Sequence, residues 1–294
     1  MRAAKAIIFY AVGLIVVSVL LAPWAYKLVH PLLPTVPFHR VFNRVVLIVA
    51  LAGLWPMLGA LGMRSWHALG LPCAGAWWRY AILGFALGIA SFAIAGALLV
   101  AVGARGFDAK LGMGTLAAQV LKFAAIGVIV ALIEETFFRG GLQGGLERSV
   151  GRVAALVVTS AVYSMVHFLK PKGVALPPEA VTWLSGVDYL GRVLVQMTQR
   201  PGVGIGFVTL LLAGLTLGWA FVKTRALYFS MGLHAGWVIT LKTFSLLTDG
   251  TRLIENATMW PVLVAVLLFV VWLCRAKLKP LTNDDSVSMA QTSR

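Results

Sequence analysis

The feature that most constrains the fold is a series of long apolar runs along the whole chain. A helix that spans a bilayer needs roughly 20 apolar residues, because its backbone polar groups must all be hydrogen-bonded within the segment. Of the 294 residues, 60% are hydrophobic and 12% are charged, which is typical of an integral membrane protein. We therefore expect an all-α, polytopic membrane bundle of about eight transmembrane helices. Their predicted positions are 6–25, 42–63, 80–103, 118–145, 152–169, 202–222, 226–247 and 257–275.

The basic residues fit a membrane topology better than a nucleic-acid partner. The net charge is +15, but the basic residues lie mainly in the loops and tails between the apolar runs. We therefore expect no nucleic-acid binding. Basic segments at 148–152, 223–225 and 275–279 favour cytoplasmic termini. The first run also resembles a signal peptide, but its apolar stretch exceeds the roughly 7–15 residues typical of one, which favours a retained helix.

One segment between the apolar runs, 170–201, has a different pattern. A proline-rich loop opens it, and Trp183, Val187, Leu190 and Leu194 then recur at helical spacing. This spacing predicts an amphipathic helix that lies on the membrane surface. Two roles stay open for it, a lid over a site or a plain interfacial connector.

Ionisable residues inside the apolar runs are few. Of the ten acidic residues, Glu134 and Glu135 fall inside a run, and of the five histidines, His167 and His234 do. Arg139 follows the two glutamates in the same run. A charge at the bilayer centre costs about 2.5–3.5 kcal/mol on insertion scales. We therefore expect these side chains to meet in the bundle interior, where such groups usually form a functional site.

Helix geometry predicts that four of these residues lie at similar depth. If the chain folds as a hairpin about Gly151, Glu135 lies 16 residues before the turn and His167 lies 16 after it. Antiparallel helices of 1.5 Å rise bring these two to one level. His234 lies ten residues past the centre of the next turn, about 15 Å into the membrane. Both turns are basic, so Glu134, Glu135, His167 and His234 are predicted to share the cytoplasmic half.

Charge pairing within the cluster favours acid–base chemistry. Glu135 and Arg139 are four residues apart and share a helix face, whereas Glu134 is turned by about 100°. Two adjacent carboxylates in a low dielectric do not both ionise easily. Arg139 stays protonated and can hold one of them charged, which leaves the other suited to a general base. The alternatives are a structural salt bridge and two core histidines, His167 and His234.

Three short motifs in order, "EETFFRG", "YSMVHF" and "GLHAGW", resemble the CPBP family of intramembrane proteases. That family includes CAAX prenyl endopeptidases of the Rce1 type and the bacterial Abi proteins. Its pattern is Glu-Glu-x-x-x-Arg, Phe-x-x-x-His and His-x-x-x-Asn, on core helices of an eight-helix bundle. The resemblance implies a catalytic core at 118–245, N-terminal transmembrane helices at 1–117, and a last transmembrane helix with a polar tail at 246–294.

The resemblance also implies a role for each residue of the cluster. Glu134 matches the glutamate thought to activate water, and Glu135 with Arg139 completes the first motif. His167 and His234 match the histidines of the second and third motifs. The implied function is an intramembrane endopeptidase in the bilayer of a bacterial plasma membrane. Its substrate would be a membrane-associated protein or peptide.

Two positions depart from the family pattern. Tyr163 stands where the family usually has Phe, which keeps the ring. Val238 stands where the family usually has Asn, which removes a polar group able to polarise a carbonyl. Another donor, such as Thr240 or Tyr163, would then be needed. Val238 also supports the main alternative, a non-proteolytic scaffold or immunity-type protein of the same fold.

The participation of a metal stays open at this stage. Glu134, His167 and His234 form an adequate zinc ligand set with one position left for water. Two carboxylates can also work without metal, as in aspartic proteases. The charge of Arg139 beside both glutamates opposes a nearby cation, which favours the metal-free form. A proton-coupled transporter is a third reading, but the chain has no repeat and no paired broken helices.

Overall fold

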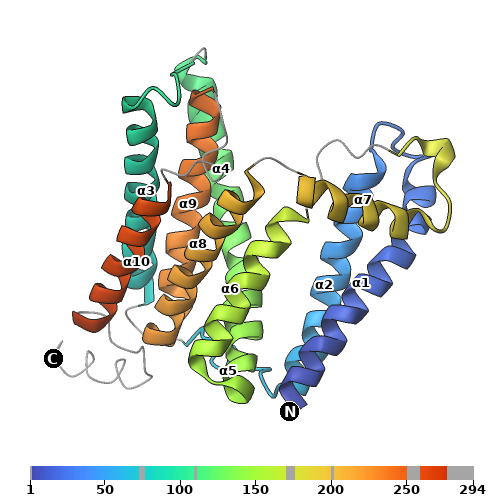
Figure 1. Cartoon of the computed structure of the whole chain (residues 1–294), viewed down its shortest axis with the longest axis horizontal. Coiled ribbons are helices and arrows are strands. Elements are labelled where there is room, and N and C mark those ends of the chain that lie inside the picture. The colour runs from blue at the N-terminus through green and yellow to red at the C-terminus, as the bar shows by residue number, and fades with distance from the viewer. Residues whose placement is uncertain are drawn as a thin grey trace. The chain divides into compact units, whose positions relative to one another are not determined.

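The computed structural model describes residues 2–72, 77–108, 111–169, 176–199, 202–249 and 259–276. Within these ranges the regular elements are helical, so the predicted all-α fold is confirmed (Figure 1). The polar tail after residue 276 lies outside them. The helices are α1 Arg2–Val29, α2 Phe38–Ala60, α3 Trp77–Ala101, α4 Met113–Glu135, η1 Thr136–Gln143, α5 Gly144–Val150, α6 Arg152–Phe168, η2 Pro178–Ala180, α7 Ser185–Gln199, α8 Val203–Thr224, α9 Tyr228–Leu247 and α10 Met259–Ala276.

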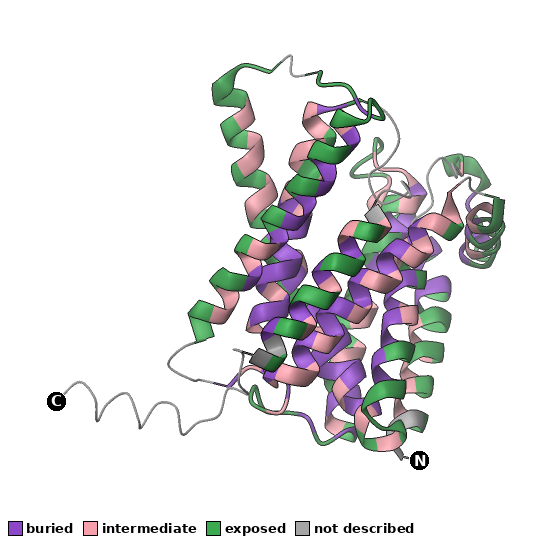
Figure 2. Cartoon of the chain, turned by 60° about the vertical axis from the view of Figure 1, so that its left-hand side comes forward, coloured by how far each residue is buried: buried purple, intermediate pink, exposed green. Residues whose placement is uncertain are grey.

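The eight predicted apolar runs each coincide with a helix. Five helical stretches of the described chain are long and apolar enough to cross a membrane: α1, α2, α3, the continuous stretch Met113–Val150, and α8. Helices α6 and α10 are also apolar, but their apolar stretches, Arg152–Phe168 and Trp260–Leu273, are shorter than these five. Figure 2 shows helices with buried residues on one side and exposed residues on the other. The exposed sides include large apolar side chains such as Phe9 and Leu121, which suits a protein surrounded by lipid.

The contacts divide the chain into two compact units, 1–64 with 165–203 and 65–164 with 204–294. The first unit contains α1, α2 and α7 around an aromatic core. In it Tyr189 of α7 contacts Phe42 with 4.7 Å between ring centroids and Phe38 with 5.5 Å. Helix α7 also approaches α1 closely, because Gly186 lies against the backbone of Val19. The three-segment division of the sequence remains a prediction.

The predicted amphipathic helix is present as α7, and it has two apolar sides. Tyr189 and Val193 face the core of the first unit. Of the predicted stripe, Trp183 just before α7, Val187 and Leu194 are exposed. Leu190 is half-buried and packs against the core. The exposed stripe fits an interfacial position, and its role as lid or connector remains a prediction.

The second unit is organised by a close crossing of α3 and α9. Gly84 and Gly88 of α3 and Gly232 and Gly236 of α9 lie at the contact. A Cβ atom on any of these four glycines would clash with the partner helix, as for Gly236 at 2.5 Å from the carbonyl oxygen of Phe85. Small residues allow membrane helices to approach closely without a side chain between them. The crossing fixes the depth of the α9 segment that contains His234.

Candidate active site

The backbone changes its winding where the two glutamates are. Helix α4 ends at Glu135, and the chain continues as the π-helix η1 from Thr136 to Gln143. A π-helix has i→i+5 hydrogen bonds, is rare, and frequently occurs at functional sites. Gly140 within η1 faces the carbonyl oxygen of Leu69, and a Cβ there would be only 2.7 Å from that oxygen. The sequence predicted one continuous helix here and gave no sign of the change.

Glu135 is the buried centre of the cluster, with no exposed surface. Its Oε1 accepts a hydrogen bond from Arg139 Nη1 at 3.0 Å. The same oxygen lies 2.8 Å from Nδ1 of His234 on α9. The predicted pairing of Glu135 with Arg139 is therefore present in the structure. Buried ions are tolerated when they are paired in this way, and Glu135 holds both a cation and an imidazole.

Arg139 joins η1 to helix α8. Its Nη2 donates to the carbonyl oxygen of Gly214 at 3.3 Å. One turn later, Nε2 of Gln143 donates to the carbonyl oxygen of Gly218 at 3.1 Å. The two glycines leave room for this approach, since a Cβ on Gly218 would lie 2.6 Å from Oε1 of Gln143. Sequence reasoning missed Gln143, although the Gly214–Gly218 spacing of four residues was a signal of close helix packing.

His234 lies between two carboxylates that differ in exposure. Its Nδ1 faces Glu135, and its Nε2 lies 3.9 Å from Oε2 of Glu134. The side chain of Glu134 is 22% exposed, whereas that of Glu135 is fully buried. Glu134 is therefore the more exposed of the two carboxylate side chains, although its Oε2 is itself buried.

Tyr163 of α6 adds an aromatic wall to the cluster. Its ring meets the ring of Phe138 edge-on at 5.2 Å and that of His234 at 6.2 Å between centroids. The guanidinium carbon of Arg139 lies 4.5 Å from the centroid of the same ring. Such an arrangement is a cation–π contact, which stabilises a buried arginine. Val238, one turn after His234, is half-buried and supplies no polar atom.

The comparison with known families covers these residues. A family model described as Type II CAAX prenyl endopeptidase Rce1-like matches residues 116–240. The resemblance predicted from the motifs is thereby confirmed: this segment is Rce1-like. It begins in α4, ends in α9, and includes Glu134, Glu135, Arg139 and His234. The match supports a CAAX-type intramembrane protease fold, and neither a curated protein nor a solved structure matches the chain.

His167, the fifth predicted site residue, belongs to the other compact unit. It lies on α6 one turn beyond Tyr163, and the boundary between the two compact units falls between these residues. Its side chain is half-buried. The role of His167 therefore remains a prediction, whereas Glu134, Glu135, Arg139 and His234 lie together in the second unit.

The described residues of the Rce1-like segment do not form a complete metal site. No group of three His, Cys, Asp or Glu side chains among the described residues could hold a metal ion. Glu134 and His234 supply two of the three predicted zinc ligands within one unit, and Nδ1 of His234 is already bonded to Glu135.

Both predicted basic turns of the Rce1-like segment lie at one end of the second unit. Glu147 of α5 accepts two hydrogen bonds from Arg225 after α8, at 2.9 and 3.0 Å. It also accepts one from Arg152 at 2.6 Å. Arg225 has a φ of 54°, a left-handed conformation that the paired contact with Glu147 helps to hold.

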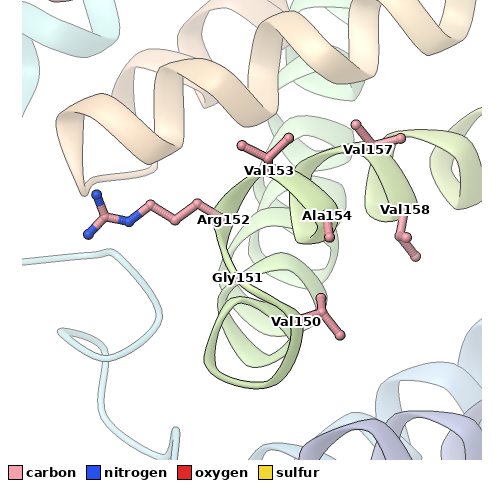
Figure 3. Close-up of a pocket in the computed structure, with 7 residues that line it drawn as sticks. All are labelled: Val150, Gly151, Arg152, Val153, Ala154, Val157 and Val158. Carbon is pink, nitrogen blue, oxygen red and sulfur yellow. The ribbon is translucent and has the colours of Figure 1, made fainter.

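A shallow groove follows the turn between α5 and α6. Figure 3 shows that valine side chains line it and that Arg152 extends away from them. Gly151, with a φ of 79°, makes this sharp turn possible. The groove is mainly apolar and does not include the glutamates, Arg139 or His234. It suits contact with lipid rather than chemistry.

Proposed function

We propose that the chain is an intramembrane endopeptidase that hydrolyses a peptide bond of a membrane-associated protein or peptide. The observation that supports it most is the unequal pair of carboxylates around His234. Glu135 is fully buried and bonded to Arg139, whereas Glu134 is partly exposed. One carboxylate can thus organise the site while the other exchanges protons with water. The Rce1-like match over 116–240 supports the same class of reaction.

In the proposed reaction, Glu134 takes a proton from a water molecule as the water oxygen attacks the peptide carbonyl carbon. The new C–O bond forms while the carbonyl π pair moves onto the oxygen. The tetrahedral intermediate then collapses and the C–N bond breaks. The leaving nitrogen receives the proton from Glu134, which yields a carboxylic acid and an amine. One water molecule is consumed, and Glu134 returns to its starting state.

His234 stabilises the oxyanion of that intermediate. Glu135 binds Nδ1 of His234 at 2.8 Å, which fixes the ring and directs Nε2 toward the Glu134 side. When His234 is protonated, the charges of Glu134, Glu135, Arg139 and His234 sum to zero. A neutral cluster is the least costly arrangement in an apolar interior. Nε2–H then donates a hydrogen bond where negative charge develops.

The proposal is tested by comparing peptide termini in membranes and secreted fractions by mass spectrometry. One strain expresses the wild-type chain and the other expresses Glu134→Gln at the same abundance. A third strain expresses Glu179→Gln, the same chemical change at an exposed position outside the cluster. Termini present in the wild type and Glu179→Gln strains but lost in Glu134→Gln would support proteolysis and identify the bond.

The alternative is a non-proteolytic scaffold of the same fold. The half-buried apolar side chain of Val238 next to His234 is the observation in its favour. The same comparison separates the two functions. Identical termini in all three strains, with unchanged phenotypes, would contradict the endopeptidase and favour the scaffold.

A further inference from the structure

Preorganised hydrogen bonds to the developing oxyanion are usually the largest source of catalysis in a hydrolytic site of this kind, so a second donor would add to the first. His234 provides one such donor in the proposed function. The other polar side chains nearby on α9 are already occupied. Ser230 donates to the carbonyl oxygen of Leu227 at 2.9 Å. Thr240 donates to the carbonyl oxygen of Gly236, also at 2.9 Å, so it is a poor second donor.

Arg139 is also committed to other partners. Nη1 bonds to Glu135 and Nη2 to the carbonyl oxygen of Gly214. Its guanidinium lies over the ring of Tyr163. Moving Arg139 toward a substrate would leave Glu135 buried without its cation, which is costly. Arg139 therefore acts on the site through Glu135 and the ring of Tyr163 rather than on the substrate.

We propose that the hydroxyl of Tyr163 is the second oxyanion donor, bonding the carbonyl oxygen of the scissile peptide beside His234. This inference rests on the proposed endopeptidase function. Tyr163 is 3% exposed, and its ring is wedged between Phe138 and His234 at nearly right angles to both. The ring therefore lies beside His234 and over the guanidinium of Arg139, the two groups that contact Glu135.

The contact with Arg139 makes Tyr163 a stronger donor for a developing negative charge. A cation 4.5 Å from the ring centroid draws electron density from the ring and polarises the O–H bond. The phenol itself is neutral, so it adds no charge to the resting cluster. Because packing already fixes the ring, the hydroxyl needs no reorganisation when the intermediate forms.

Replacing Tyr163 by phenylalanine tests the role of the hydroxyl as a hydrogen-bond donor, because the rest of the side chain is unchanged. The ring contacts with Phe138, Arg139 and His234 remain in Tyr163→Phe, and the hydroxyl is lost. The matched control is Tyr10→Phe, which removes a hydroxyl that donates to the carbonyl oxygen of Ala50 in the first unit. The full-length chain is reconstituted in liposomes, and the probe is a synthetic peptide spanning a bond found by the termini comparison. Turnover is measured per folded enzyme, with melting temperature in detergent as the measure of folding.

We expect Tyr163→Phe to lower kcat by about 10²–10³-fold with KM nearly unchanged, the usual effect of removing one oxyanion donor. Tyr10→Phe is expected to retain wild-type turnover. If Glu134→Gln is inactive while Tyr163→Phe keeps the wild-type kcat, the donor role is wrong and the protease function stands. If Tyr163→Phe lowers total cleavage only in proportion to the amount of folded protein, turnover per folded enzyme is unchanged, and the donor role is contradicted. Equal cleavage by the wild type and Glu134→Gln would instead contradict the proposed function itself.

Discussion

His234 and Glu135, 99 residues apart in sequence, meet at 2.8 Å between Nδ1 and Oε1. This contact joins α9 to the end of α4 inside one compact unit. It divides the two adjacent glutamates into different tasks. Glu135 holds the ring of His234 and the guanidinium of Arg139, and Glu134 remains partly exposed. The following predictions test this division and the packing that produces it.

Replacing each glutamate by glutamine should affect stability unequally. Glu135→Gln leaves the charge of Arg139 buried without a partner, which should destabilise the fold by about 3–5 kcal/mol. Glu134→Gln should leave stability within about 0.5 kcal/mol, because the Glu134 side chain is partly exposed and lies 3.9 Å from His234, farther than Glu135 lies from its two partners. Melting in detergent at equal protein concentration measures both. Equal losses of stability in the two variants would contradict the different roles assigned to Glu134 and Glu135.

The glycine crossing of α3 and α9 should tolerate no side chain. Gly232→Ala places a Cβ against the carbonyl oxygen of Ala81, which forces α9 and His234 to move. We expect a marked fall in folded protein and loss of cleavage by what remains. Gly204→Ala is the matched control, because nothing lies within 4 Å of a Cβ there. That control should be neutral or stabilising by up to about 1 kcal/mol. Similar behaviour of both variants would contradict the role of the crossing.

Gln143 should be needed to hold η1 against α8. Gln143→Leu removes the hydrogen bond to the carbonyl oxygen of Gly218 and should cost about 1–3 kcal/mol of stability. Gln199→Leu makes the same change at an exposed position of α7 and should have little effect. The melting temperatures of the two variants are compared with that of the wild type. An unaltered melting temperature for Gln143→Leu would show that η1 does not depend on this contact.

Metal removal should leave the activity intact. Arg139 lies 3.0 Å from Glu135, and its positive charge opposes a cation bound between the two glutamates. We expect a zinc chelator to leave the rate of peptide cleavage unchanged. Metal content of the purified chain is measured by mass spectrometry in parallel. Stoichiometric zinc whose removal abolishes cleavage, and whose return restores it, would overturn the metal-free mechanism.

The sequence predicted the elements with strong local signals. Apolar runs of about 20 residues identified the helices, because lipid leaves few other structures possible. The four-residue spacing of Glu135 and Arg139 predicted their ion pair, and helix rise predicted that His234 reaches the same depth. These predictions succeeded because each depends on regular helix geometry.

The remaining features depend on contacts between distant segments. The π-helix η1 has no local signature, and in the structure it coincides with bonds from Arg139 and Gln143 to α8. The inner face of α7 was also missed, since Tyr189 finds its partners on α2 rather than near it in sequence. Of the predicted stripe, Leu190 packs against the core of the first unit, whereas Trp183, Val187 and Leu194 are exposed.

The most direct test of the central role of Glu134 is cleavage in water enriched in ¹⁸O. The purified chain in liposomes is given the synthetic peptide, and the products are weighed by mass spectrometry. The wild type should yield a new C-terminal carboxylate with one ¹⁸O atom, and Glu134→Gln should yield no product above background. Wild-type amounts of labelled product from Glu134→Gln would contradict the assignment of Glu134 as the base. Cleavage without incorporation of ¹⁸O would contradict hydrolysis by water.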